Sequence, residues 1–379
     1  MIKIVFISTG LSIGGAEIML LKLIERIDRT RFSPHVISLT TSGDLASSFM
    51  KLGVPVHAIG LKTGSVSIAP VVRLISLLRG LRPDVVQTWM YHADLIGGLV
   101  AWSSGFRPIV WALHNTDLSK ERTKRSTLLV VRACSMLSSW LPRTILSCSK
   151  RACAVHAALG YDRNKFHVIP NGFDLGLFRP DEAARVEVRA ELKLSVDTQL
   201  VGLMARYDPQ KNHLGFVHAA AVIHQRMPDV HFLLAGTGVD EGNADLLNAI
   251  TRQGLSGHIH LLGRREDMPR LMAALDVLAS PSCGEAFPLV LGEAMACGVP
   301  CVVTDVGDSA EIVGATGRVV EVDDMQGLAS HIVELLRLPG VQKVDLGRQA
   351  RERIASHFEI GEVTRSYQAF YERTVKGKI

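Results

Sequence analysis

The sequence predicts an α/β protein built from two Rossmann-like domains, each with a doubly wound parallel sheet. The chain has 379 residues, which is too long for one ordinary core and fits two domains. Short β-branched runs alternate with amphipathic helical stretches, which is typical of parallel strands joined by helices. This alternation stops near residue 171 and starts again near residue 199.

The expected elements follow from the hydrophobic periodicity. In the first half we expect strands at residues 3–8, 35–40, 84–88, 109–114, 144–149 and 165–170, and helices that include residues 16–27 and 68–79. In the second half we expect strands at residues 199–205, 230–235, 258–262, 276–280, 299–304 and 317–322. Beyond them, residues 325–375 are predicted to be almost entirely helical.

The domain boundary is marked by turn-forming residues. Asn171-Gly172 and Pro180 interrupt the chain between the two runs. We expect an N-terminal domain over residues 1–175, a C-terminal domain over residues 176–355, and a helical segment over residues 356–379 that packs back on the N-terminal domain. Because ligands of open parallel sheets bind at the carboxyl ends of the strands, two domains facing across a cleft are suited to two substrates.

Composition excludes several classes. With 47% hydrophobic and 21% charged residues, the chain is globular rather than disordered. Its six cysteines form no C-x-x-C pair and are expected to be free thiols. H-E-x-x-H, Walker A and D-x-D patterns are missing, so metal sites of those kinds are not predicted.

The termini and apolar stretches predict a cytoplasmic protein. The first apolar run stops at Ser8 and has no cleavage-site pattern, so a signal peptide is not expected. The most apolar long stretch, residues 126–148, is interrupted by Arg132, Pro142 and Arg143 and is not expected to span a membrane.

Charge is unevenly distributed. Residues 1–175 hold 21 Lys and Arg against 10 Asp and Glu, a net charge of +11, whereas the remainder carries −6. The basic half is therefore suited to an anionic partner: nucleic acid, a membrane surface or a pyrophosphate lipid. An ordinary solvated basic surface is the alternative.

The clearest motif is an E-x7-E segment, CGEAFPLVLGEAMACGVP, at residues 283–300. Glu285 follows a predicted strand, and Pro288 suits the first position of the next helix. The N–H groups of Leu289 and Val290 would then stabilise an anion. Glu293 can accept hydrogen bonds from two neighbouring hydroxyls, such as a ribose diol. A capped helix with two solvated glutamates is the alternative.

A second motif follows the first strand of the C-terminal domain. Arg206 and Lys211 flank a turn in MARYDPQKN. Two fixed cations there could hold a diphosphate and neutralise charge on a leaving group, as a metal does elsewhere. An ordinary surface pair is the alternative.

Four further strand ends carry candidate residues. The glycine-rich junctions at Gly14-Gly15 and at Gly236-Thr237-Gly238 allow close backbone approach. His114 ends a predicted strand, where ligands gather. Arg264 and Arg265 follow another strand, and the sequence does not distinguish between them. For each, a structural or solvent-exposed role is the alternative.

These segments together resemble glycosyltransferase family 4, the retaining enzymes of GT-B fold also called glycosyl transferases group 1. The resemblance implies that Glu285 contacts the donor sugar, Glu293 the ribose, and Arg206 and Lys211 the diphosphate. It gives the catalytic positions as His114, Arg206, Lys211 and Glu285, and the donor-binding positions as Gly14, Gly15, Arg206, Lys211, Gly236, Gly238, Arg264, Arg265, Glu285, Ala286, Phe287, Pro288, Leu289, Val290 and Glu293.

The implied reaction is sugar transfer from a nucleotide diphosphate donor, with no metal and no cofactor. A UDP-sugar is favoured over a GDP-sugar. The expected acceptor is a glycan or a polyprenyl-linked glycan in cell-surface polysaccharide biosynthesis, and no nucleic acid partner is expected. A sugar-nucleotide epimerase of the same fold and an inactive nucleotide-binding protein are the alternatives.

A basic, apolar stretch predicts peripheral attachment to the inner face of the cell membrane. Its cations are Lys120, Arg122, Lys124, Arg125, Arg132, Arg143, Lys150 and Arg151. Residues 128–131, Met136, Leu137, Trp140 and Leu141 are interleaved with them. This composition favours a helix lying on an anionic membrane, and packing of the apolar residues on the sheet is the alternative.

Overall fold

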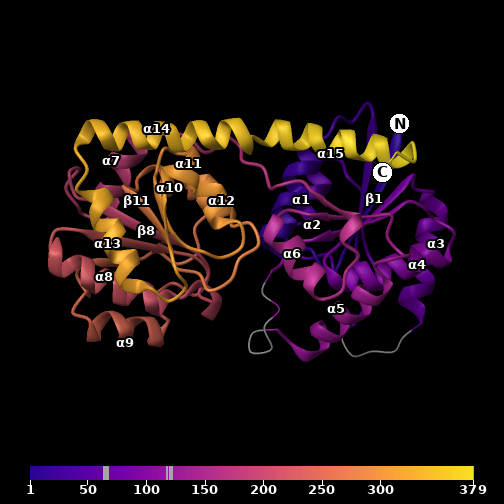
Figure 1. Ribbon diagram of the computed structural model, residues 1–379, viewed down its shortest axis with the longest axis horizontal. Coiled ribbons are helices and arrows are strands. Elements are labelled where there is room, and N and C mark those ends of the chain that lie inside the picture. Colours follow the sequence, from indigo (N-terminus) through magenta and orange to yellow (C-terminus); the bar gives the residue numbers. More distant parts are fainter. Residues whose placement is uncertain (63–67, 117, 119–122, 379) are drawn as a thin grey trace. The chain divides into compact units, whose positions relative to one another are not determined.

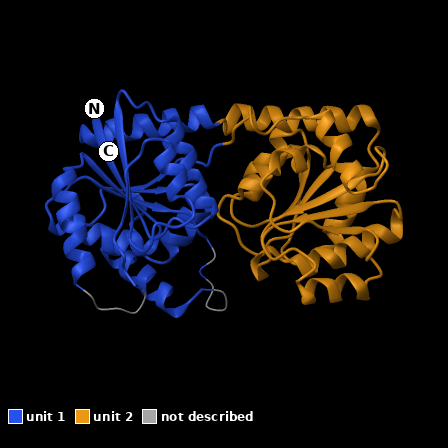
Figure 2. Ribbon diagram, turned by 180° about the vertical axis from the view of Figure 1, so that it is seen from behind, with its two compact units in different colours: residues 1–172, 360–379 blue, residues 173–359 orange. Residues whose placement is uncertain are grey.

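The chain forms two compact units in a computed structural model that describes residues 1–62, 68–116, 118 and 123–378 (Figures 1 and 2). Unit 1 comprises residues 1–172 and 360–379, and unit 2 comprises residues 173–359. Each unit is built around one sheet in which every described strand pair is parallel. The predicted fold class, two Rossmann-like parallel-sheet domains, is therefore confirmed.

Unit 1 has a seven-stranded sheet in the order β3-β2-β1-β4-β5-β6-β7. Its strands are β1 (Ile2–Ser8), β2 (Phe32–Ser38), β3 (Val56–Ala58), β4 (Val85–Trp89), β5 (Ile109–Leu113), β6 (Thr144–Ser147) and β7 (Phe166–Val168). The chain runs outward from β1 in one direction and from β4 in the other, so the order of the strands reverses between β1 and β4. In open parallel sheets, ligands bind at the carboxyl ends of the strands where the order reverses in this way.

Helices cover both faces of this sheet. One face is covered by α1 (Gly15–Arg26), α2 (Ala46–Lys51) and α15 (Ile360–Val375). The other is covered by α3 (Ala69–Leu81), η1 (Ala93–Gly97), α4 (Gly98–Ser103) and α5 (Arg125–Leu137). The short elements α6 (Lys150–Ala158) and η2 (Arg163–Lys165) precede β7. Helix α1 is amphipathic because Met19, Leu20, Leu23 and Ile24 fall on one face and are buried.

Helix α15 belongs to unit 1 although it lies at the end of the chain. Tyr367, Phe370 and Tyr371 are buried in the same core as β1 and α1. The Tyr371 hydroxyl donates a hydrogen bond of 2.6 Å to Oε1 of Gln87 in β4. Unit 1 is therefore completed by the last helix of the chain.

Unit 2 has a six-stranded sheet in the order β10-β9-β8-β11-β12-β13. Its strands are β8 (Leu200–Met204), β9 (His231–Ala235), β10 (Ile259–Leu261), β11 (Val277–Ser280), β12 (Cys301–Thr304) and β13 (Arg318–Val320). Here the order reverses between β8 and β11, which are paired directly. The loops that follow β8 and β11 thus emerge side by side at one edge of the sheet.

The helices of unit 2 follow the expected alternation. They are α7 (Glu182–Glu191), η3 (Pro209–Lys211), α8 (His213–Arg226), α9 (Ala244–Arg252), α10 (Met268–Ala273), α11 (Leu289–Ala296), α12 (Ser309–Val313), η4 (Gly314–Thr316), α13 (Met325–Leu336) and α14 (Gly340–His357). Helices α8, α9 and α13 pack on the strands through one apolar core. Its centre includes Phe216, Phe232 and Ile332, each fully buried.

Every predicted strand is present, with ends shifted by up to three residues. The prediction missed β3, which has only three residues, all half-buried. Its sequence, Val-His-Ala, has no β-branched run, and it is placed by pairing with β2.

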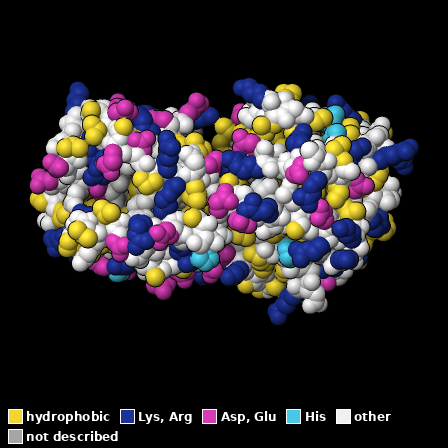
Figure 3. All heavy atoms as spheres, turned by 90° about the horizontal axis from the view of Figure 1, so that it is seen from above, with side chains coloured by type: hydrophobic (Ala, Val, Ile, Leu, Met, Phe, Trp, Pro, Cys, Tyr) yellow, Lys and Arg dark blue, Asp and Glu magenta, His cyan; other side chains and the backbone are white. Residues whose placement is uncertain are grey.

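Charges of both signs are interspersed around α14 in unit 2 and around α15 in unit 1 (Figure 3). On α14, Arg348 pairs with Asp345 and with Glu352 at 2.6 Å each. On α15, Arg365 pairs with Glu362. Neither helix therefore offers a single sign of charge to a partner. Among the described helices, none is long and apolar enough to cross a membrane.

Four histidines gather at the β9–β10 edge of unit 2. Nδ1 of His231 lies 3.0 Å from Nε2 of His260. The ring of His258 is 4.8 Å from that of His231 and 4.2 Å from that of His224 on α8. Burial, with His231 and His258 nearby, lowers the pKa of His260 to about 4. The cluster is therefore assembled with His260 neutral.

We expect this cluster to destabilise the fold in acid. A histidine in the unfolded chain titrates at its ordinary pKa of about 6.5, whereas folded His260 resists protonation down to about 4. Its contribution is complete above about pH 6.5 and declines as the pH falls toward 4.

Urea unfolding at neutral pH and near pH 5 tests this expectation. His260→Gln should flatten the pH dependence of the free energy of unfolding, with the exposed His218→Gln on α8 as matched control. If His260→Gln has the same pH dependence of the free energy of unfolding as the wild type, the histidine cluster does not cause the loss of stability in acid.

Candidate active site

The candidate site lies where the strand order of unit 2 reverses. Lys211 ends η3, which follows β8, and Glu285 lies in the loop after β11. Because β8 and β11 are neighbours, these two loops meet although 74 residues separate the two side chains in the chain. Nζ of Lys211 forms an ion pair with Oε1 of Glu285. Sequence analysis proposed both residues for the site, and the structure brings them together.

The pair is largely desolvated and is held from several sides. The Lys211 side chain is 19% exposed and that of Glu285 12%. The Ser282 hydroxyl donates a hydrogen bond of 2.9 Å to the same Glu285 oxygen. The Gln210 side-chain amide donates to the Gly284 carbonyl, and the Cys283 N–H donates to the Gln210 carbonyl at 2.8 Å. The cation and the carboxylate are thus preorganised.

A third loop, after β12, supports the Glu285 backbone. Gly307 has a φ of +53°, and a Cβ there would lie 2.3 Å from the Glu285 carbonyl oxygen. The Asp308 N–H donates a hydrogen bond of 2.9 Å to the carbonyl of Ala286. Sequence analysis missed Ser282, Gln210, Gly307 and Asp308. The available signal was a Gly-Asp pair just after a predicted strand.

The helix that follows Glu285 is shorter than its sequence suggests. Pro288 has an extended ψ of 115° and is the N-cap of α11, so the helix begins at Leu289, one residue later than predicted. The first N–H groups of a helix are not used by its own hydrogen-bond ladder, which leaves this end suited to an anion. Glu293 lies one turn further along and is half-buried.

The residues between Glu285 and the helix are packed inward. The side chains of Ala286 and Phe287 are buried, and the Phe287 ring stacks on Phe173 at 6.2 Å between centroids. Gly292 of α11 leaves room for the same ring, because a Cβ there would lie 2.2 Å from Phe173. At Ala286 and Phe287, the backbone is therefore the part that remains suited to a ligand.

Arg206 differs from Lys211 in its surroundings. Its side chain is 57% exposed, and Nε lies 3.3 Å from Oδ2 of Asp208. The Asp208 carboxylate also accepts the Gln210 N–H at 2.9 Å, which places it at the start of η3. Although burial raises the pKa of Asp208, these contacts hold it below its ordinary value. Arg206 is consequently a more accessible cation than Lys211, whose pair with Glu285 is largely desolvated.

The loop after β9 closes against the loop after β8. The Tyr207 N–H donates to the Thr237 carbonyl at 2.8 Å. A Cβ at Gly236 would lie 2.1 Å from the Ala205 carbonyl oxygen, and Gly238 has a φ of +75°. Gly236 is thus required by the close backbone approach between the two loops, and glycine is favoured at Gly238 by its left-handed backbone conformation.

The structure distinguishes the two arginines after β10. Arg265 pairs with Glu191 at 2.7 Å and with Asp267 at 2.8 Å, and the hydrogen bonds that it donates to these carboxylates raise its pKa. Arg264 is exposed next to Gly263, whose carbonyl accepts the Gly236 N–H at 2.8 Å. Arg265 is therefore a structural ion-pair partner, and Arg264 is the one that faces solvent beside the glycine loop.

The candidate residues of unit 1 form a separate group at its own strand reversal. Gly14 is the N-cap of α1 and Gly15 its first residue. Nε1 of Trp89, at the end of β4, donates a hydrogen bond of 3.1 Å to the carbonyl of Ala16. The His114 ring, after β5, stacks on Trp89 at 4.4 Å. The glycine loop and His114 are thus joined through Trp89, which sequence analysis did not single out.

His114 is held neutral by its environment. Burial lowers its pKa to about 3, and its Nδ1 is buried without a hydrogen-bond partner among the described residues. A neutral imidazole at a strand end can donate or accept one hydrogen bond, but it does not supply a positive charge near neutral pH.

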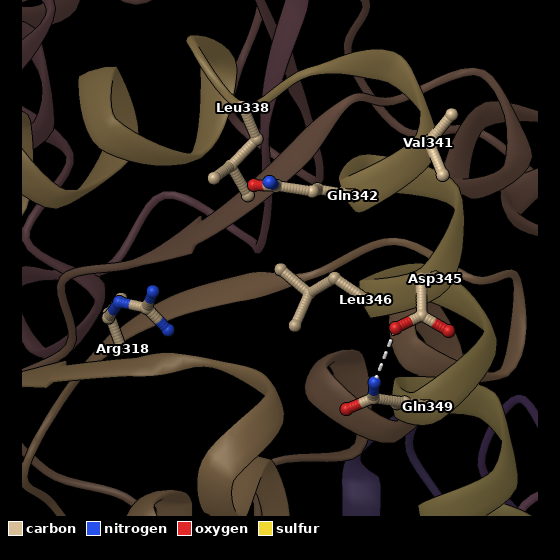
Figure 4. Close-up of a pocket in the computed structure, with 7 residues that line it drawn as sticks. All are labelled: Arg318, Leu338, Val341, Gln342, Asp345, Leu346 and Gln349. Carbon is tan, nitrogen blue, oxygen red and sulfur yellow. Dashed lines mark hydrogen bonds between the residues drawn. The ribbon is translucent and has the colours of Figure 1, made fainter.

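A surface groove of unit 2 lies away from the Lys211–Glu285 site. This groove of about 420 Å³ is lined by Arg318, Leu338, Val341, Gln342, Asp345, Leu346 and Gln349 (Figure 4). Leu338 and Leu346 point toward it, and the Gln349 amide donates to Asp345 at 2.7 Å. It shares no residue with the Lys211–Glu285 site and carries no charge pair of comparable burial.

Comparison with known proteins places these observations in a family. Residues 13–177 match the model described as Glycosyltransferase Family 4, and residues 198–338 match Glycosyl transferases group 1. The second match includes the strand reversal of unit 2 and the Lys211–Glu285 pair. The chain belongs to the family 4-type glycosyltransferases of GT-B fold.

Individual relatives agree with this assignment. The chain is 29% identical over 303 residues to an Escherichia coli UDP-Gal:alpha-D-GlcNAc-diphosphoundecaprenol alpha-1,3-galactosyltransferase, covering 76% of this chain and 75% of the relative. It is 27% identical over 327 residues to the putative glycosyltransferase EpsF of Bacillus subtilis, covering 80% and 79%. The fold of the Anabaena protein HepE, solved with UDP and glucose, matches with a TM-score of 0.86 at 24% identity over 98% and 100% of the two chains.

Proposed function

We propose that this glycosyltransferase moves a sugar from a UDP-sugar to a lipid-linked glycan, with retention of anomeric configuration, in cell-surface polysaccharide biosynthesis. The observation that carries the proposal is the desolvated Lys211–Glu285 pair beside the start of α11, at the strand reversal of unit 2. A cation and helix N–H groups suit a diphosphate, and a carboxylate suits sugar hydroxyls.

The proposed roles follow from these surroundings. Lys211 and the exposed Arg206 bind the diphosphate, and Glu285 accepts hydrogen bonds from the donor sugar. Glu293, one turn into α11, binds the ribose hydroxyls, and Arg264 contacts the nucleobase. During transfer the bond between the anomeric carbon and the phosphate oxygen breaks, and the acceptor oxygen bonds to that carbon on the same face. The acceptor proton passes to the departing diphosphate, whose charge the two cations stabilise.

The choice of donor and acceptor draws on the relatives. The Anabaena structure contains UDP, which favours uridine over guanosine in the donor. The Escherichia coli relative is named for a diphosphoundecaprenol-linked acceptor. An enzyme acting on such an acceptor would work at the inner face of the cell membrane, from the cytoplasm.

The test is acceptor-dependent release of UDP from a panel of UDP- and GDP-sugars, with the anomeric configuration of the product determined by NMR. We expect release only with acceptor, and a product of the donor's own configuration. Release without acceptor would instead indicate an epimerase, binding without turnover an inactive protein, and an inverted product would reject the retaining mechanism.

We expect transfer to continue in the presence of EDTA. Lys211 and Arg206 supply two cations where a metal would otherwise neutralise the leaving group. Initial rates with and without chelator, and after adding back Mg²⁺ or Mn²⁺, measure this directly. A rate that collapses with EDTA and returns with metal would contradict the proposal.

A further inference from the structure

One stripe of α5 is exposed along the whole helix. Arg125, Leu129, Arg132 and Met136 follow one another at spacings of three and four residues, so they lie on a single face. Leu129 is 69% and Met136 73% exposed. The opposite face is buried through Val131 and Cys134. The predicted apolar stretch is thus divided: part packs on the sheet, and part faces outward between cations.

The stripe continues into an exposed aromatic pair. Trp140 follows α5 and Trp102 lies in the last turn of α4, and their rings meet edge to face at 5.3 Å. They are 50% and 40% exposed. The Arg107 guanidinium lies over the Trp102 ring, 5.1 Å from its centroid. Two indoles and a cation from separate elements therefore converge at one place on the surface.

The loop that carries Trp140 is fixed rather than loose. Nζ of Lys165 donates a hydrogen bond of 2.8 Å to the Pro142 carbonyl. The Ser138 hydroxyl accepts the Asp162 N–H at 2.9 Å, and Arg143 donates to the Gly377 carbonyl at 3.1 Å. These contacts fix the loop so that the large apolar side chain of Trp140 stays exposed to water. Such exposure is unfavourable unless a partner covers the side chain.

The two sequence segments that carry the stripe and the Trp102–Trp140 pair are basic. No Asp or Glu occurs in residues 95–116 or in residues 122–161. The described cations of these segments are Arg107, Lys124, Arg125, Arg132, Arg143, Lys150 and Arg151. Lys124 and Arg125 stand at the start of α5, where the helix dipole favours acidic residues instead. Helix stability therefore does not account for these cations.

Helix α5 runs from one end of the strands of unit 1 to the other. The helix begins after β5, on the sheet edge where His114 lies, and ends before β6 on the opposite edge. From Arg125 to Leu137 it is about 20 Å long. A flat surface touching the whole stripe would lie alongside unit 1 and reach the edge that holds the glycine loop and His114.

We propose that one surface of unit 1 lies on an anionic lipid bilayer. This bilayer-binding surface consists of the α5 stripe (Arg125, Leu129, Arg132, Met136) together with Trp102 and Trp140. The inference rests on the proposed lipid-linked acceptor. Exposed indoles, aliphatic side chains and flanking arginines are the composition of a helix in the membrane interface. A second copy of the chain is disfavoured, since an isologous contact would oppose cations of the same sign. Lys120 and Arg122, also predicted for this interface, lie outside the described residues.

Sedimentation with phosphatidylcholine vesicles, with and without phosphatidylglycerol, tests the proposal. The wild-type protein should bind the anionic vesicles at low salt and leave them at high salt. Trp102→Gln/Trp140→Gln should weaken binding roughly tenfold or more. Arg132→Glu should weaken it roughly 20- to 30-fold, because two units of charge are lost.

Helix α2 offers matched controls on the other face of the same sheet. Lys51→Glu matches Arg132→Glu, and Met50→Gln, at a methionine that is 57% exposed, is the control for replacing an exposed apolar side chain with glutamine. The control variants should bind vesicles like the wild type. Thermal unfolding and UDP binding check that every variant folds.

The outcomes separate this surface from the proposed reaction. In the variants of the bilayer-binding surface, transfer to a short water-soluble acceptor should be unchanged. Transfer to a lipid-linked acceptor in vesicles should decrease in parallel with vesicle binding. If the wild-type protein transfers sugar but does not bind anionic vesicles, the proposed bilayer-binding surface is refuted and the proposed function is not. Vesicle binding without any transfer overturns the proposed function alone. Self-association that disappears in Trp102→Gln/Trp140→Gln would instead make this face a dimer contact.

Discussion

Replacing Lys211 with alanine should lower kcat by about 10²- to 10³-fold while the protein stays folded. The ammonium group is the buried member of the two cations proposed for the diphosphate, with 19% of its side chain exposed. Its loss removes charge stabilisation from the transition state and leaves the Glu285 carboxylate, 12% exposed, without its cation. Steady-state kinetics at saturating donor, with circular dichroism as a check on folding, measure the effect.

Two companion variants show whether the effect belongs to the site. Arg206→Ala should also lower kcat strongly, and Lys343→Ala on α14 is the matched control for losing a lysine from unit 2. Lys211→Ala/Glu285→Gln should not recover activity if Glu285 binds the sugar. Recovery in the double variant would mean that the pair is a structural salt bridge and no more.

Replacing Glu293 with alanine should weaken UDP binding by roughly 10- to 150-fold for each hydrogen bond lost to the carboxylate. Glu285→Ala should affect binding of bare UDP little, because its proposed partner is the sugar. Calorimetry with UDP compares the two variants in the same buffer. This contrast follows from their places in the fold, one in the loop after β11 and one on α11.

A ligand lacking the ribose hydroxyls makes the experiment specific. If Glu293 binds the diol, 2′,3′-dideoxy-UDP should bind the wild-type protein weakly, and Glu293→Ala should weaken it little further. Additive losses would instead mean that Glu293 acts through the packing of α11, where its neighbour Gly292 contacts Phe173.

Much of the fold was predictable because its strands are buried on both faces. Such strands read as short apolar runs, and β8 and β11 were placed within a residue or two. The edge strand β3 was missed because its pairing with β2, rather than its own sequence, places it. Likewise, the start of α11 depended on the ψ of Pro288, which the sequence does not determine.

The site was predictable as residues but not as contacts. Arg206, Lys211, Glu285 and Glu293 stood out by residue type and by position at strand ends. That Lys211 pairs with Glu285 depends on the strand order, and that order is set by long-range packing. Arg264 and Arg265 differ in role because Arg265 pairs with Glu191, about seventy residues earlier in the chain.

The central claim is that Lys211, Arg206 and the start of α11 hold the diphosphate of a uridine nucleotide without a metal. Calorimetric titration of the wild-type protein with UDP, UMP and uridine in EDTA tests it most directly. We expect UDP to bind much more tightly than UMP, and UMP more tightly than uridine, with the UDP advantage lost in Lys211→Ala. Equal affinities for the three ligands, or tight UDP binding that requires added metal, would contradict the claim.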